Sequence, residues 1–159
     1  MPAPGNILVV CTANICRSPM AAALLKHALA GQPEPLRSLE VVSAGVSARG
    51  GEPATEHAIA TLKKVGLDLT GHRSRPLNDG MLDQALAVIC MTESHRAVIR
   101  FTAARPPGNL WLFREFMPQK ANKEIADPYG SAASVYQACR DEMVEAIPSL
   151  LKAIKAAVK

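Results

Sequence analysis

One short segment of the chain combines a thiol, a guanidinium and a sequence that starts a helix. It reads Cys-Thr-Ala-Asn-Ile-Cys-Arg-Ser-Pro, with Cys11 at its first position and Arg17 at its seventh. Backbone N–H groups in a loop that leads into a helix N-terminus bind anions, and the same field stabilises a thiolate. The guanidinium of Arg17 adds a planar fork of donors for two phosphate oxygens. The segment therefore predicts a phosphate site beside a nucleophile.

This arrangement suits phosphoryl transfer through a covalent intermediate. Cys11 would attack phosphorus in line and give a thiophosphate enzyme intermediate. The segment is neither a Walker A loop nor a dinucleotide fingerprint, because it lacks the glycine patterns of both. A plain strand, loop and helix with two buried cysteines is the alternative interpretation. The apolar run before Cys11, the Ser-Pro pair after Arg17 and the uninterrupted length of the loop favour the phosphate site.

The elements that must position this loop alternate along the chain. Short apolar, β-branched runs predict strands over Ile7–Val10, Val41–Ala44, Ala85–Met91 and Leu110–Phe113. Helical spacing predicts helices from Ser18 to Leu29, over Pro53–Val65, over Glu93–Ala104, and from Ser131 onward. Ser18 is the expected N-cap of the first helix, and Pro148 is expected to kink or divide the last.

Alternating strands and helices indicate an α/β fold in one domain over residues 1–159. The expected architecture is a four-stranded parallel sheet with helices on both faces. In such sheets ligands bind at the carboxyl ends of the strands, at a topological switch point. The loop after the first strand is therefore the expected phosphate-binding site.

Composition excludes several classes of protein. The chain has 159 residues, of which 48% are hydrophobic and 20% are charged, as in a globular domain. The net charge of +4 suits an anionic substrate, but 4% aromatic residues are too few for a nucleic-acid stacking surface. We interpret the basic residues between Ala85 and Arg114 as a solvated helix face. No run approaches the roughly 18–20 apolar residues of a membrane span, and the N-terminus lacks a basic signal region, so we expect a cytoplasmic protein.

The remaining cysteines and the histidines give no metal site. Cys90 and Cys139 stand at apolar positions and are expected in the core. The four histidines lack metal-ligand spacing, and His27 and His57 are expected to face solvent. We predict neither a metal nor an organic cofactor. The oligomeric state stays open.

Several motifs together resemble one known family. Residues 11–18 resemble the signature of the low-molecular-weight protein tyrosine phosphatases, a cysteine and an Arg-Ser pair separated by five residues. Ser43-Ala44-Gly45, Met91–His95 and Asp127-Pro128-Tyr129 match further motifs of that family in the same order. An Asp-Pro pair alone is a common turn, but its co-occurrence with the loop, more than a hundred residues away, is specific. The resemblance covers nearly the whole chain.

The resemblance implies a role for each matching residue. It makes Cys11 the nucleophile, Arg17 the phosphate ligand and Asp127 the general acid. The phosphate-binding loop would consist of Thr12, Ala13, Asn14, Ile15, Cys16, Arg17 and Ser18. Ser18 would also hydrogen-bond the thiolate, and Asn14, Ser43 and His72 would hold the shape of the loop. Cys16 would be a second thiol that can form a disulfide with Cys11 and protect it from overoxidation.

The substrate cleft implied by the resemblance is formed by Ile15, Arg49 and Tyr129. Three positions depart from the usual pattern of the family. Ala13 replaces a common glycine, Arg49 stands where many members carry an aromatic wall, and Gly130 stands where some carry a second aromatic residue. We expect a cleft that is less aromatic than is typical.

The chain is thus interpreted as a cysteine-dependent phosphatase that hydrolyses phosphotyrosine in proteins. Its partner would be a phosphorylated protein substrate. One alternative is a protein arginine phosphatase, a branch of the same family that the sequence Asp-Pro-Tyr-Gly resembles. Arsenate reduction is a second alternative, although related enzymes use a further pair of redox cysteines. A phosphate-binding module without catalysis is the third.

Overall fold

The computed structural model describes residues 5–158 and contains the predicted four-stranded parallel sheet. The strand order is β2-β1-β3-β4, with every neighbouring pair parallel. The strands are β1 (Asn6–Cys11), β2 (Glu40–Gly45), β3 (Ala85–Cys90) and β4 (Leu110–Leu112). Each lies within a residue or two of its predicted range. The second strand is therefore added on one side of β1, and the third and fourth are added on its other side. Cys11 lies at the carboxyl end of β1, where the order of the strands reverses.

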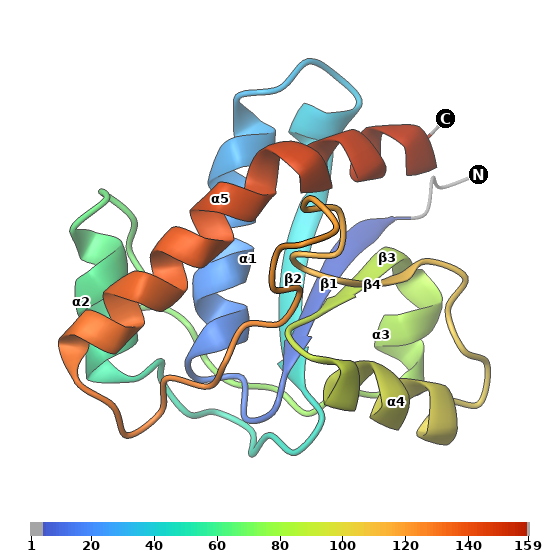
Figure 1. The fold of residues 1–159 in the computed structure, drawn as a ribbon. Helices are drawn as coiled ribbons and strands as arrows, with labels where there is room; N and C mark the ends of the chain where they lie inside the picture. Colours follow the sequence, from blue (N-terminus) through green and yellow to red (C-terminus); the bar gives the residue numbers. More distant parts are fainter. Residues whose placement is uncertain (1–4, 159) are drawn as a thin grey trace.

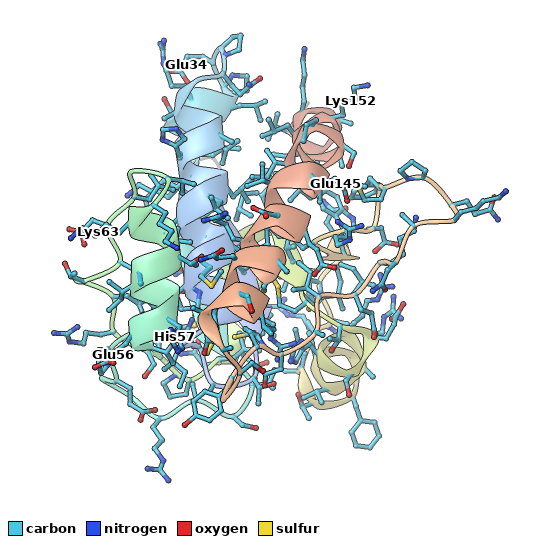
Figure 2. All side chains as sticks on the ribbon, turned by 60° about the vertical axis from the view of Figure 1, so that its left-hand side comes forward. Glu34, Glu56, His57, Lys63, Glu145 and Lys152 are labelled. Atoms are coloured by element: carbon cyan, nitrogen blue, oxygen red, sulfur yellow. The ribbon has the colours of Figure 1, made fainter. Side chains whose placement is uncertain are left out.

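Helices cover both faces of the sheet, as predicted (Figure 1). They are α1 (Arg17–Ala30), α2 (Glu56–Lys63), α3 (Asp79–Gln84), α4 (Glu93–Thr102) and α5 (Ala133–Ala157), with a short 3-10 helix, η1 (Leu36–Ser38). Helices α1, α2 and α5 lie side by side on one face, with Glu56 and Lys63 on the outer side of α2 (Figure 2). Helices α3 and α4 lie on the other face.

The alternation of side chains along β1 divides the core into two layers. Ile7 and Val9 pack under α1, α2 and α5, whereas Leu8 and Val10 pack under α3 and α4. All four side chains are completely buried, as expected of a central strand covered on both faces. Cys90 and Cys139 are buried, in agreement with their predicted place in the core.

Two predicted helix starts are wrong. Helix α1 begins at Arg17 with Cys16 as its N-cap residue, because the Ser18 hydroxyl is bonded to groups of the loop instead. Helix α2 begins at Glu56 and not at Pro53, since Thr55 accepts a hydrogen bond from the Ala58 N–H and supplies the cap. Helix α3 was not predicted from the sequence.

The last helix is continuous. Helix α5 runs through Pro148 without a break, and Figure 1 shows that it changes direction along its length. Of the two outcomes expected for Pro148, division of the helix is not observed. Among residues 5–158, no helix is long and apolar enough to span a membrane. Residues 1–4 and 159 of the predicted domain lie outside the described range, as does most of the N-terminal segment on which the expectation of no signal sequence rests.

The basic residues between Ala85 and Arg114 do not form one solvated face. The guanidinium of Arg96 lies 2.8 Å from the Glu115 carboxylate, and that of Arg114 lies 2.9 Å from the Glu145 carboxylate. Both arginine side chains are almost inaccessible to solvent. These two arginines join elements of the fold by ion pairs. Arg100 and Arg105 are exposed, so the prediction of a solvated face is correct for those two residues and wrong for Arg96 and Arg114.

Candidate active site

One cavity opens at the carboxyl end of β1, at the edge of the sheet where the phosphate loop was predicted. Figure 1 shows the loop after β1 and the segment that precedes α5 at this same lower edge. The cavity has a volume of about 350 Å³ and contains most of the predicted site residues. Its lining consists of Cys11, Thr12, Ala13, Ile15, Cys16, Arg17, Ser47, Arg49, Glu52, Asp127 and Tyr129.

The glycine at the end of β2 lets the phosphate loop lie close to this strand. A Cβ atom at Gly45 would lie 2.5 Å from the Thr12 carbonyl oxygen and 3.0 Å from the Asn14 nitrogen. The next two residues donate backbone hydrogen bonds of 2.9 Å to the carbonyls of Cys11 and Thr12. The motif Ser43-Ala44-Gly45 therefore has a physical role, because only a residue without a side chain fits beside the loop.

Asn14 is the central residue of the loop. Its backbone is left-handed, with φ of 60°, a conformation that asparagine tolerates better than most residues. Its side chain accepts a hydrogen bond from the Arg75 N–H and donates to the hydroxyls of Ser18 and Ser43. The His72 ring nitrogen lies 2.7 Å from its carbonyl oxygen. The structure thus brings together the residues expected to hold the shape of the loop.

The neighbouring position, Ala13, needs no glycine. Asn14 is the only non-glycine residue with positive φ between residues 5 and 158. The left-handed turn of the loop is therefore made one position later than Ala13. The departure from the family pattern at Ala13 carries no backbone strain.

Hydrogen bonds fix the direction of the Ser18 hydroxyl. Because Ser18 Oγ accepts a bond of 2.7 Å from the Asn14 amide, its own proton is free to point to the Cys11 sulfur, 3.0 Å away. The Ser18 N–H at the start of α1 donates to the same sulfur at 3.4 Å. The thiol of Cys11 therefore receives two donors at a helix N-terminus, an arrangement that stabilises a thiolate.

Arg17 lines the same cavity, and its buried guanidinium is held by the protein. One terminal nitrogen donates to the Ile125 carbonyl at 3.0 Å, and the other donates to the Thr12 hydroxyl at 3.3 Å. The second nitrogen also lies 3.8 Å from a carboxylate oxygen of Asp127. The guanidinium thus lies between the loop and the Asp127 segment.

The carboxyl group of Asp127 is oriented by its own turn. One of its oxygens accepts a hydrogen bond of 3.0 Å from the Tyr129 N–H, as an aspartate before a turn commonly does. The other oxygen is the one that faces Arg17. The side chain is about half exposed, so the structure brings Asp127 to the mouth of the cavity with one oxygen left for a ligand.

Cys16 lines the cavity and lies against the start of α2 and helix α5. Its sulfur is 3.3 Å from the Tyr136 hydroxyl and 3.7 Å from that of Thr55. Burial raises the pKa of the Cys16 thiol. All four cysteines are in the described part of the chain, and all four are free.

The rim of the cavity contains the three predicted cleft residues. Ile15 is partly buried and packs against the core, Arg49 lines the opening, and Tyr129 is largely exposed. Two further lining residues, Ser47 and Glu52, were not predicted. No local pattern singles them out, because their place in the cavity depends on the loop after β2.

Sequence reasoning also missed a role for His95 beyond its place in the Met91–His95 motif. Its side chain is buried at the start of α4, and its Nε2 lies 2.8 Å from the Thr12 hydroxyl. Burial and the nearby Arg17 guanidinium lower the pKa of His95 to about 4, and burial lowers the pKa of His72 as well. His27 and His57 are exposed, and the His57 ring lies against the Tyr136 ring. Within residues 5–158 no three histidine, cysteine or acidic side chains form a metal-binding group.

Comparisons with known proteins identify the family of this chain. Residues 6–159 match the family model of the low molecular weight phosphotyrosine protein phosphatases. The chain is 39% identical over 154 residues to the protein-arginine-phosphatase of Geobacillus stearothermophilus, covering 96% of this chain and 97% of the relative. It is 34% identical over 132 residues to the low molecular weight protein-tyrosine-phosphatase Etp of Escherichia coli K12, covering 83% and 82%.

A solved structure shows the same fold. The low molecular weight protein tyrosine phosphatase of T. tengcongensis superimposes with a TM-score of 0.84 at 31% identity, covering 93% of this chain and 98% of the other. The chain belongs to the low-molecular-weight phosphotyrosine protein phosphatase family.

Proposed function

We propose that this chain is a cysteine-dependent protein phosphatase that prefers phosphotyrosine and works through a thiophosphate intermediate on Cys11. One observation carries the proposal. The Cys11 sulfur, the buried Arg17 guanidinium and the Asp127 carboxyl group line a single cavity at a helix N-terminus. A phosphate in this cavity would have a nucleophile on one side and a proton donor on the other.

In the first step the Cys11 thiolate attacks phosphorus, and the bond from phosphorus to the ester oxygen breaks. Protonated Asp127 gives its proton to the departing oxygen, so that the leaving group departs as a neutral phenol. The loop amides and Arg17 bind the phosphoryl oxygens, whose charge is spread in the transition state. Cys11 then carries the phosphoryl group.

In the second step water attacks the same phosphorus. The carboxylate of Asp127, deprotonated by the first step, accepts a proton from that water. The bond from sulfur to phosphorus breaks, and the Ser18 O–H and N–H again stabilise the released thiolate. Inorganic phosphate leaves and the enzyme returns to its starting state.

The preference for phosphotyrosine rests on Ile15. Its apolar side chain lines the cavity and favours contact with an aromatic ring. It offers no acceptor to a guanidinium, and a buried donor without a partner costs about 1–3 kcal/mol. Arg49 on the same rim adds a positive charge, which disfavours a cationic substrate.

Phosphoarginine is the second candidate substrate, and two observations favour it. The relative from Geobacillus stearothermophilus is a protein-arginine-phosphatase. Glu52 places a second carboxylate in the cavity besides Asp127, and carboxylates accept hydrogen bonds from guanidinium groups. The cleft therefore contains features that favour each substrate.

Two peptides of the same flanking sequence, one phosphotyrosyl and one phosphoarginyl, decide between the candidates. We expect the larger kcat/KM for phosphotyrosine. Ile15→Thr, which supplies a hydroxyl acceptor, should shift the ratio toward phosphoarginine by about tenfold. A wild-type protein that favours phosphoarginine would overturn the preference. Absence of turnover with both peptides would overturn the proposed activity itself.

We further propose that Cys16 protects the nucleophile. Hydrogen peroxide oxidises the Cys11 thiolate to a sulfenic acid, and the Cys16 thiol condenses with it to give a disulfide and water. The free thiols of all four cysteines support a reducing, cytoplasmic site of action.

A further inference from the structure

The Thr12 hydroxyl connects the phosphate loop to helix α4. Thr12 lies at the cavity, and its oxygen is 2.8 Å from Nε2 of His95. The same oxygen accepts a hydrogen bond from the Arg17 guanidinium at 3.3 Å. The Thr12 hydroxyl thus connects His95 by hydrogen bonds to Arg17, the expected phosphate ligand.

The helix cap determines which nitrogen of His95 carries the proton. His95 is the third residue of α4, and its Nδ1 accepts the N–H of the cap residue, Thr92, at 3.3 Å. A neutral imidazole has one acceptor and one donor, so Nε2 carries the proton and donates to Thr12. Burial and Arg17 lower the pKa of His95 to about 4, so the ring is neutral at neutral pH.

The Thr12 oxygen then accepts two hydrogen bonds, one from His95 and one from Arg17. We propose that His95 and Thr12 are positioning residues, which hold the Arg17 guanidinium in its phosphate-binding orientation before substrate arrives. The proposal rests on the proposed function, since it takes Arg17 as the phosphate ligand. It assigns the Met91–His95 motif a role in the site.

The start of α4 also holds the segment that carries Asp127. The Glu93 N–H donates to the Glu124 carboxylate at 2.8 Å, and the Ile125 N–H donates to the Met91 carbonyl at 3.0 Å. The Ile125 carbonyl in turn accepts from Arg17. The guanidinium is therefore held on two sides by groups that are themselves fixed at the N-terminus of α4.

A matched pair at Thr12 tests this proposal. Thr12→Val removes the hydroxyl while keeping the shape of the side chain, and Thr12→Ser keeps the hydroxyl. We expect Thr12→Val to lower kcat and to weaken vanadate binding, each by about tenfold. The kcat and the vanadate affinity of Thr12→Ser should each exceed those of Thr12→Val by about fivefold or more. Circular dichroism should show that both variants are folded at the assay temperature, so that a loss of activity in Thr12→Val reports on the site. Equal kcat and equal vanadate affinity in the two variants would overturn the proposal.

A double-mutant cycle tests the part played by His95. We expect His95→Ala to lower kcat/KM by about tenfold in the wild type and to have little further effect in the Thr12→Val background. Gln at position 95 retains an acceptor for the helix cap and a donor for Thr12, so His95→Gln should recover at least half of the loss. An equal effect of His95→Ala in both backgrounds would refute the connection. If His95→Ala does not fold, the Thr12 pair still decides.

These outcomes are separate from the proposed function. Wild-type turnover of a phosphopeptide tests the phosphatase activity without reference to Thr12 or His95. A wild type that turns over while Thr12→Val equals Thr12→Ser would refute the positioning role alone. A wild type without turnover would refute the proposed function.

Discussion

Replacing Asn14 by alanine should destabilise the protein more than any other single change in the phosphate loop. The Asn14 side chain is completely buried. It makes three hydrogen bonds, accepting from the Arg75 N–H at 2.9 Å and donating to Ser18 at 2.7 Å and to Ser43 at 2.9 Å. Asn14→Ala removes all three hydrogen bonds and leaves their partner groups without the Asn14 amide.

The expected loss follows from these contacts and from the backbone. Each buried hydrogen bond contributes about 1 kcal/mol net. Alanine in the left-handed conformation that Asn14 adopts, with φ of 60°, costs a further 1 kcal/mol or more, as an order of magnitude. The sum is about 4 kcal/mol of the free energy of unfolding.

Urea unfolding of the wild type, Asn14→Ala and Asn14→Gly measures this loss. Glycine loses the same three bonds but adopts positive φ freely, so it should be more stable than alanine by roughly 0.5–1 kcal/mol once its larger unfolded-state entropy is included. A loss below about 1 kcal/mol in Asn14→Ala would refute the assigned network. A glycine variant less stable than alanine would refute the role of the left-handed backbone.

Four further changes concern the general acid, the glycine beside the loop, the second thiol and the buried histidine. Asp127→Asn should slow phenyl phosphate by about 10²–10⁴-fold but p-nitrophenyl phosphate far less; an equal loss for both would make the residue a structural turn. Gly45→Ala should weaken inorganic phosphate binding at least tenfold, measured by calorimetry, because the added Cβ would lie 2.5 Å from a loop carbonyl. Cys16→Ser should lose activity to hydrogen peroxide irreversibly, whereas dithiothreitol should restore the wild type; equal recovery would exclude protection. Because the pKa of His95 falls from 6.5 to about 4 on folding, the unfolded chain binds the proton first as the pH drops. The free energy of unfolding should therefore decrease by about 3 kcal/mol from this residue between pH 6.5 and 4, and His95→Gln should show a shallower decrease in urea titrations at several pH values.

The sequence predicted the sheet well because a central parallel strand has a strong signature. Ile7, Leu8, Val9 and Val10 are each buried, and a short β-branched run of this kind is typical of a strand covered on both faces. The phosphate loop could be predicted equally well, since its chemistry depends on residues within one short segment. The role of Asp127 could not be predicted from the neighbouring residues, because an Asp-Pro pair is a common turn. Only the resemblance to the family suggested a role for it.

The errors arose where tertiary contacts override local preference. Ser18 has a favourable cap composition, but the hydrogen bonds to Asn14 and Cys11 use its hydroxyl. The pattern between Ala85 and Arg114 resembled a solvated face, yet Arg114 is buried in an ion pair with α5. The contact between His95 and Thr12 joins residues that are 83 positions apart, a distance that no local pattern spans.

Mapping the phosphoryl group in rapidly quenched reactions shows whether Cys11 carries it during turnover. The wild type and Cys11→Ala would each be mixed with p-nitrophenyl phosphate, quenched, digested and examined by mass spectrometry. We expect a phosphorylated peptide that contains Cys11 in the wild type. We expect neither a phosphopeptide nor turnover in Cys11→Ala, which should still bind inorganic phosphate through the loop amides and Arg17. Turnover by Cys11→Ala near the wild-type rate would contradict the covalent mechanism.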